Sequence, residues 1–329
     1  MNRYDLIRWD RLKELGISFE YIKTNVKNIY NYEIKEKTID SFIDNIANYK
    51  DIKVIELLNI LENEAYKKAY VFSIVQYKKN KNMPIIQDMT SMLNAYFIEK
   101  NDIQSDSNKY KLDEIFRITE YIQKDKFAVI KLARVIQTKI VEPMDDGTID
   151  EFEKEIYDCC KFYIDIDNKL VIMFFNDIKE SDTNPAKEIT YKKSAFRSLF
   201  DGVTNKNMVR YFMNEYLEEF FKEYMKEYRN KDNRKLISII EATSNEGDEE
   251  RSLIRSVKKD FTHNIKRLEA IEYDIENEGL NISEIECCIK GNFIDIKMGG
   301  EITCINTFLY KEVIGDVCKE FFNGYTVLQ

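Results

Sequence analysis

Three residues near the end of the chain combine two carboxylates with a lysine. Glu286 falls on one predicted strand, and Asp295 and Lys297 fall on the next, across a turn at Gly291-Asn292. Successive side chains of a strand point to opposite faces, so Asp295 and Lys297 share a face. The register of the turn decides whether Glu286 joins them, because a one-residue shift would bring Cys287 opposite instead. If the three side chains meet, they could organise a divalent cation and a water for attack on a phosphodiester.

This arrangement resembles the signature of the restriction-endonuclease-like nucleases of the PD-(D/E)xK type. In that family two carboxylates hold Mg²⁺ and a lysine helps to activate the attacking water. The resemblance is confined to this terminal hairpin, and Glu286 stands where the family has an aspartate. It implies catalytic roles for Glu286, Asp295 and Lys297, with Mg²⁺ as the only cofactor. The alternative interpretation is the polar face of an ordinary antiparallel hairpin with a Glu–Lys pair across the strands.

A second candidate site is a row of basic residues in the segment 249–273, which we predict to be a long helix. The members of the row recur at helical spacing, which allows them to share one face; they are Arg251, Arg255, Lys258, Lys259 and Lys266. Residues 186–270 carry 18 basic and 15 acidic groups, a net charge of +3, whereas the whole chain carries −9. Such a face could follow a nucleic-acid backbone. The alternative is a solvated helix face whose charge is balanced by acidic residues at the helix N-terminus.

The scarcity of glycine and histidine excludes several kinds of site. The chain has ten glycines, none of them between Gly16 and Gly147, and its single histidine is His263. Glycine-rich phosphate loops and dinucleotide fingerprints need glycine where the backbone closely approaches a ligand. Serine–histidine catalysis and histidine-ligated metal sites need histidine, usually more than one. We therefore expect no metal site or cofactor apart from the Mg²⁺ of the nuclease hypothesis.

The acidic segment 142–153 is similar in its second half to a calcium-binding EF-hand loop. Asp146, Gly147, Asp150 and Glu153 stand at suitable positions, but Met144 occupies a ligand position. An acidic turn that leads into a helix explains the same residues, because acidic groups favour the first turn of a helix. We favour the turn.

Hydrophobic periodicity predicts a mixture of helices and strands. We expect helices at 41–47, 52–70, 89–97, 111–123, 207–228, 249–273 and 308–322. We expect strands at 70–75, 127–141, 162–166, 169–175, 236–240, 285–289, 293–298 and 302–305, with hairpin turns at Asp167-Asn168 and Gly291-Asn292. The predicted fold class is α+β, helix-rich with two small antiparallel β-patches. The predicted regions are a mainly helical one at 1–125, a hairpin-containing one at 126–185 and an α+β domain at 186–329.

Composition indicates a cytosolic location and a binding function. No secretory signal or membrane span is visible, and six cysteines in 329 residues suit free thiols. We therefore expect a cytoplasmic protein that binds a macromolecule, with nucleic acid as the candidate partner. The Mg²⁺-dependent nuclease is the first alternative, and a structural or regulatory subunit that binds a protein partner is the second. Heavy use of Ile, Lys and Asn suggests a bacterial or phage genome, and a defence or mobile-element setting is a hypothesis built on it. No feature indicates an oligomeric state.

Overall fold

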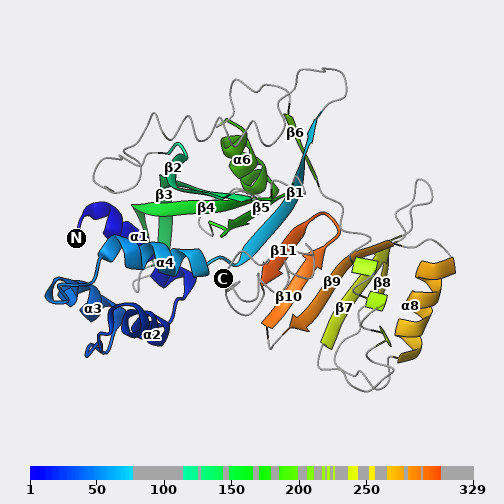
Figure 1. Cartoon of the computed structure of the whole chain (residues 1–329), viewed down its shortest axis with the longest axis horizontal. Helices are drawn as coiled ribbons and strands as arrows, with labels where there is room; N and C mark the ends of the chain where they lie inside the picture. Colours follow the sequence, from blue (N-terminus) through cyan, green and yellow to red (C-terminus); the bar gives the residue numbers. More distant parts are fainter. Residues whose placement is uncertain are drawn as a thin grey trace. The chain divides into compact units, whose positions relative to one another are not determined.

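The computed structural model divides the chain into two compact units (Figure 1). The first unit comprises residues 1–66, 76–168 and 175–205, and the second comprises residues 67–75, 169–174 and 206–329. The residues that the structure describes are 1–76, 114–124, 127–143, 148–165, 170–178, 185–198, 206–210, 217–218, 221–222, 225–226, 236–243, 252–255, 265–277, 281–289 and 292–304. The three regions predicted from the sequence stay a prediction.

The first unit combines an N-terminal helical layer with a three-stranded sheet. Its helices are α1 (Arg3–Leu15), α2 (Phe19–Tyr30), α3 (Ile39–Asn45), the short 3₁₀ helix η1 (Ile46–Asn48), α4 (Val54–Glu64) and α6 (Pro185–Ser198). Its strands are β2 (Arg117–Lys124), β3 (Phe127–Pro143) and β4 (Ile149–Asp165). Helix α1 begins with a capping box between Asn2 and Asp5 and ends at Gly16, whose positive φ of 84° suits glycine.

The sheet of the first unit is antiparallel and carries helices on both faces. β3 pairs with β4 along its whole length, from Phe127 opposite Asp165 to Pro143 opposite Ile149. On one face Ala133, Val135 and Tyr157 pack against Ile7 of α1. On the other face Phe162 stacks on Phe196 of α6, with ring centroids 4.4 Å apart. Strand alternation thus sends neighbouring β3 side chains to two different helical layers.

The second unit holds a larger sheet, the helix α8 (Ile265–Asn277) and the helical residues 217–218, 221–222 and 225–226. Its strands are β1 (Lys68–Gln76), β5 (Leu170–Phe175), β6 (Lys206–Arg210), β7 (Leu236–Thr243), β8 (Ser252–Arg255), β9 (Asn281–Ile289), β10 (Asn292–Lys297) and β11 (Glu301–Cys304). They follow one another in the order β5-β1-β11-β10-β9-β7-β8, and β6 also pairs with β1. The pairs β1–β11, β11–β10, β10–β9, β9–β7 and β7–β8 are all antiparallel.

The prediction of two small β-patches is wrong, although the α+β class is right. The strands of the second unit form one large sheet, and the first unit adds two strands of 17 residues each. Local pattern reveals individual strands, whereas the extent of a sheet depends on pairing between distant segments such as β1 and β11. Several of these distant partners were assigned to helices in the sequence analysis.

The helix predicted at 111–123 is wrong where the structure describes it, because Arg117–Lys124 forms β2. Its β-branched and aromatic residues favour a strand, and it pairs with β3, whose residues opposite it are buried and, apart from Lys131, apolar. The helix predicted at 52–70 ends earlier, at Glu64, and β1 follows it. The helices predicted at 89–97 and 308–322 lie outside the described residues.

The two long helices predicted in the C-terminal half are wrong in part. Residues 206–210 form β6, while residues 217–218, 221–222 and 225–226 are helical. Residues 252–255 form β8, and within the described residues the segment is helical at Ile265–Asn277. In both segments the apolar residues fit a helical period, yet pairing to a sheet edge prevails in the first part.

The hairpin predicted at residues 285–298 is confirmed, as is the strand prediction for 127–141. β9 ends at Ile289 and β10 begins at Asn292, which stands opposite Ile289, so Asn292 belongs to the strand and not to the predicted turn. Gly291 lies outside the described residues, and β3 covers residues 127–143. Strands also end and begin on either side of Asp167-Asn168, but those two residues lie outside the described part of the chain. Among the described residues, no helix combines the length and the apolar composition needed to cross a membrane.

Candidate functional site

The terminal hairpin brings the predicted carboxylates and lysine to one face of the second unit's sheet. In the register of β9 with β10, Asp295 stands directly opposite Glu286, and Lys297 stands opposite Glu284. Residues that oppose each other in an antiparallel pair share a face, so all four lie on the same side. The one-residue shift that would have brought Cys287 opposite Asp295 does not occur.

Lys68 of β1 and Glu301 of β11 complete this face, and the sequence analysis selected neither of them. Lys297 Nζ lies 3.7 Å from Asp295 Oδ2 and 3.9 Å from Glu284 Oε2. Lys68 of β1 lies 3.9 Å from Glu301 of β11. Only the strand order reveals these two residues, because β1 and β11 are far apart in the sequence. We call Lys68, Glu284, Asp295, Lys297 and Glu301 the hairpin cluster.

Asp295 is the most perturbed carboxyl of the hairpin cluster. Burial, together with like-charge repulsion from Glu284 and Glu301, raises the pKa of Asp295 to about 7 against the opposing effect of Lys297. Its Oδ1 is buried and has no hydrogen-bond partner among the described residues. Burial also acts on Lys297, but the carboxylates of Asp295 and Glu284 outweigh it and raise the pKa of that ammonium. A carboxyl that titrates near neutrality can donate or accept a proton.

We expect Asp295→Asn to raise the melting temperature at pH 8 and to leave it unchanged at pH 4. The folded protein retains a proton on Asp295 that the unfolded chain releases, so stability falls as pH rises from the usual aspartate range towards 7. An amide imitates the protonated carboxyl and removes this loss; each kcal/mol gained raises the melting temperature by about 2 °C. Thermal unfolding at the two pH values checks this, and a lower melting temperature of the variant at pH 8 would contradict it.

The described residues do not contain a ready-made metal site. Nowhere among them do three or more His, Cys, Asp or Glu side chains converge so that they could hold a metal ion. Glu286 and Asp295 are therefore at most a two-carboxylate site, and the fit to the Mg²⁺ of the nuclease hypothesis is incomplete. The hairpin cluster can hold and move protons with the groups that it already has.

The basic row does not form a single helix face. Arg255 ends β8, opposite Ile240 of β7, and Lys266 lies ten residues further on in α8. Arg251, Lys258 and Lys259 lie outside the described part of the chain. The spacing argument for a common face required one continuous helix, and β8 interrupts it. Nucleic-acid binding by these five residues stays a prediction, and it no longer has the support of a shared helix face.

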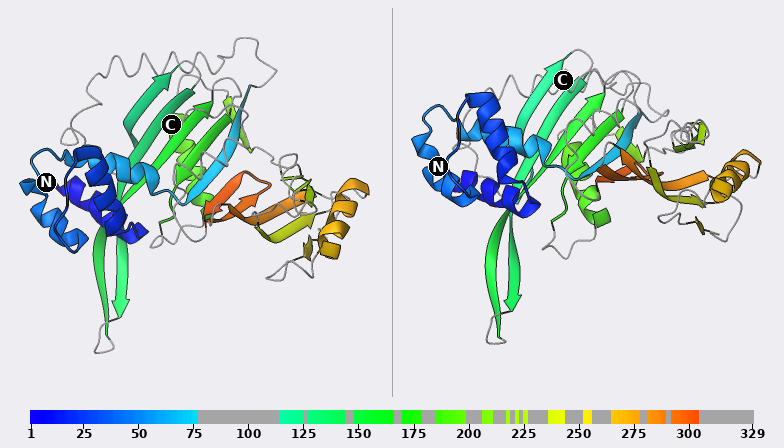
Figure 2. Two further views of the ribbon diagram at one scale, coloured as in Figure 1. Left: turned by 60° about the horizontal axis from the view of Figure 1, so that its bottom comes forward. Right: turned by 90° about the horizontal axis from the view of Figure 1, so that it is seen from below.

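The far end of the long hairpin of the first unit extends away from its helices. Figure 2 shows β3 and β4 running beyond the helices as a two-stranded ribbon. β2 begins opposite Ala133, so the outer part of β3 pairs only with β4 among the described strands of this unit. We call residues 137–143 and 149–155 the β3–β4 arm. Seven strand residues reach about 20 Å.

The β3–β4 arm exposes large apolar side chains. Ile149 is 68% exposed and Phe152 is 39% exposed. The arm contains most of the segment that is similar to an EF-hand loop, but strands flank that segment on both sides. Both interpretations offered for 142–153 expected a helix after the acidic turn, and both are wrong on this point because a strand begins at Ile149.

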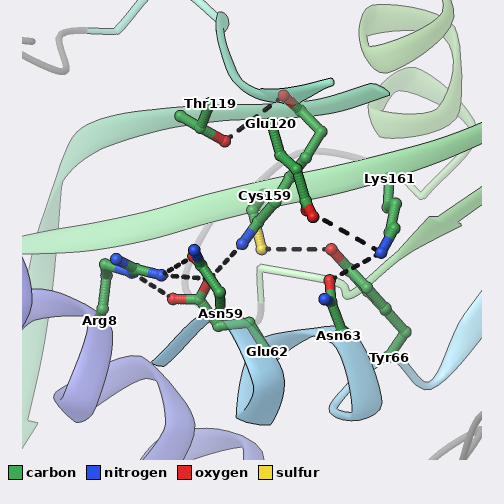
Figure 3. Close-up of polar contacts among 10 residues, drawn as sticks. Arg8, Asn59, Glu62, Asn63, Tyr66, Thr119, Glu120, Cys159 and Lys161 are labelled. Carbon is green, nitrogen blue, oxygen red and sulfur yellow. Dashed lines mark hydrogen bonds and ion pairs between the residues drawn. The ribbon is translucent and has the colours of Figure 1, made fainter. Parts of the chain in front are cut away.

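A buried charge network ties the root of the β3–β4 arm to the N-terminal helices (Figure 3). The Glu62 carboxylate of α4 accepts hydrogen bonds from Arg8 of α1 and from Lys131 of β3. Arg8 Nη2 lies 2.9 Å from Glu62 Oε2. Arg8 also donates to Asn59 Oδ1 at 2.7 Å and lies over the Tyr157 ring. Burial alone would raise the pKa of Glu62, but the two cations outweigh it and lower that pKa. Three elements thus share one ionised carboxylate.

A second buried network ties the opposite face of the same strands to α6. Asp158 of β4 accepts from Arg134 Nε at 2.8 Å and from Lys192 Nζ at 3.3 Å. The Arg134 guanidinium also lies 4.5 Å from the ring centroids of both Phe116 and Tyr191. Cation–π contacts of this kind stabilise a partly desolvated guanidinium.

Two surface ion pairs continue the attachment outward along β4. Arg3 of α1 donates a hydrogen bond from its Nε to Glu155 Oε2, 2.9 Å away. Lys154 forms an ion pair with Glu14 near the end of α1. Both contacts stand where the arm leaves the helical layer. The arm is therefore fixed at its root and exposed beyond it.

The cysteines of the first unit are not suited to nucleophilic chemistry. Cys159 and Cys160 are free thiols on β4. Burial raises the pKa of Cys159 to about 11, with a further contribution from Glu62 and an opposing one from Lys131. The thiol is the unreactive form, so Cys159 acts as a packing residue.

The sequence matches no protein-family model and no curated protein.

Proposed function

We propose that this protein is a subunit of a macromolecular complex and that it docks through the β3–β4 arm. The observation that carries this proposal is the exposure of Ile149 and Phe152 on a hairpin whose root is held by two buried charge networks. Each face of the arm thus presents one large exposed apolar side chain, and exposed apolar surface on a projecting element suits an interaction site. This is the second alternative of the sequence analysis, and the arm replaces the basic row as the contact element.

The anchoring of the arm supports a docking role. A two-stranded ribbon alone is marginally stable in water, so an ordered arm needs support at its root. Lys131, Arg134 and Asp158 supply it, from the part of β3 and β4 that lies under the helices. Buried ionic networks of this kind contribute little net stability compared with apolar packing, but they favour a single arrangement of the elements that they join. A fixed arm loses little conformational freedom on binding.

We expect a shortened arm to abolish association with a partner without unfolding the protein. Thr138 and Lys154 stand directly opposite each other, so Asn-Gly can replace residues 139–153 as a two-residue hairpin turn. The ion pairs of Lys154 and Glu155 with α1 remain in this variant. Affinity purification from cells that express the protein, followed by quantitative mass spectrometry, measures the association.

A point variant and a matched control separate the arm from general surface changes. Ile149→Ser with Phe152→Ser should lose the same partner as the shortened arm. Ile29→Ser on α2 removes a side chain that is 44% exposed and should retain the partner. If the shortened arm retains every partner of the parent protein, the arm is not the docking element.

The Mg²⁺-dependent nuclease is a second candidate function, favoured by the register of the terminal hairpin. Asp295 opposes Glu286 directly, and Lys297 lies 3.7 Å from Asp295. If this face cleaves phosphodiesters, Asp295→Ala should abolish Mg²⁺-dependent cleavage of DNA or RNA and keep the fold. Glu20→Ala on helix α2 of the first unit should cleave like the parent. Absence of cleavage by the parent protein with Mg²⁺ or Mn²⁺, or full cleavage by Asp295→Ala, would eliminate this candidate.

A further inference from the structure

We infer that the β3–β4 arm docks onto a basic protein surface that contains an apolar pocket. This inference rests on the proposed function and names the chemistry of the partner. Segments 137–143 and 149–155 contain five acidic and two basic residues, a net charge of −3. The arm thus concentrates negative charge beside its exposed apolar side chains.

Three of the five acidic residues lie on one face of the arm, and the other two, Glu142 and Asp150, stand opposite each other on the other face. Ile149, Glu151, Glu153 and Glu155 alternate along β4, so they share a face. Arg3 already pairs with Glu155 at the root, while Glu151 and Glu153 are exposed. The face therefore offers two exposed carboxylates, with the exposed Lys139 opposite Glu153 and Ile149 beyond them.

The other face of the arm carries the exposed aromatic side chain of Phe152. Phe152 points to the opposite face from Glu151 and Glu153 because strand side chains alternate. Its 39% exposure leaves part of an aromatic ring in water. Buried aromatic anchors contribute much of the binding energy at protein interfaces, whereas charges at the rim contribute mainly to association rate and specificity. Phe152 and Ile149 are the anchors in this account, and the carboxylates select the partner.

Charge decides among the possible occupants. Nucleic acid is a polyanion and would be repelled by Glu151 and Glu153. A second copy of the chain would bring the same acidic face against itself, and the whole chain carries a net charge of −9. A protein with clustered lysine and arginine around an apolar pocket complements both faces of the arm.

The test uses a synthetic amphipathic helical peptide with lysine and arginine on one face and leucine on the other. Fluorescence anisotropy should show that the full-length protein binds it and that binding weakens as salt rises. Glu151→Lys with Glu153→Lys should weaken binding about tenfold. The matched control, Glu20→Lys with Glu33→Lys, makes the same change of net charge at two residues that are each 82% exposed. It should bind within about twofold of the parent.

Three outcomes would overturn the inference. They are equal weakening in both charge-reversed variants, preference for the same peptide with glutamate in place of its basic residues, and no binding by the parent protein. Loss of native partners by the shortened arm, combined with failure to bind the basic peptide, would retain the docking function and reject the basic partner. In the converse result, peptide binding depends on Glu151 and Glu153, but the protein with the shortened arm still binds its native partners. That result would reject the docking function and would leave the binding of basic peptides by the arm standing.

Discussion

Replacing Glu62 with glutamine should lower the free energy of unfolding of the first unit by about 3–5 kcal/mol, because it leaves two buried cations without their shared carboxylate. Lys131 is 1% exposed and Arg8 is 6% exposed, so water cannot replace the lost partner. Trp9, the only tryptophan, is fully buried beside Arg8 on α1. Its fluorescence during urea unfolding therefore reports on this unit.

A control on the same helix separates the buried network from general effects on α4. Glu56→Gln removes an exposed ion pair with Lys53 and should change the free energy of unfolding by less than about 1 kcal/mol. The pH dependence gives a further check. Since the pKa of Glu62 is lowered in the folded protein, its contribution is present above the usual glutamate range and lost as pH falls through the folded pKa. A Glu62→Gln protein as stable as Glu56→Gln would contradict the anchoring role of this network.

Replacing Asp158 with asparagine should have a comparable effect on the opposite face, about 3–5 kcal/mol. This change removes the carboxylate from Arg134 and from Lys192, which is 0% exposed. The rings of Phe116 and Tyr191 still face Arg134, so we expect Lys192 to carry most of the loss.

Adding Lys192→Met to Asp158→Asn should recover part of the lost stability, because it removes the buried ammonium. The exposed Glu151→Gln on the same strand is the control and should behave like the parent in urea unfolding. If Lys192→Met lowers stability further in the Asp158→Asn background, the two residues are not coupled through their charges.

Local signals were sufficient for hairpins and insufficient for the sheet. The turn at Gly291-Asn292 and the β-branched run 127–141 indicate their strands through short-range pattern alone. The assignment of 207–210 to a helix failed because its apolar spacing suits a helix as well as a strand, and only pairing with β1 decides between them. The strand at 252–255 was missed for the same reason, since it pairs with β7.

For the candidate sites, too, local pattern predicted some of the residues and strand pairing revealed the others. Alternation places Asp295 and Lys297 on one face, as predicted, and the register adds Glu286. Lys68 and Glu301 join the hairpin cluster only through the pairing of β1 with β11, which no local pattern contains. The β3–β4 arm was missed because the acidic turn was interpreted as the start of a helix. Ile149 and Phe152 are three residues apart, a spacing that fits a helix as well as a strand, so no local alternation marked this strand.

Site-specific photo-crosslinking tests the docking role of the arm most directly. A photoreactive phenylalanine analogue is placed at Phe152 in cells that express the full-length protein, and at Ile29 on α2 as the control position. We expect Phe152 to give a discrete protein adduct that Ile29 does not give and that disappears when Ile149 is replaced with serine. Irradiation that yields no adduct at Phe152, or the same adducts at both positions, would contradict the proposal that the β3–β4 arm is a docking element.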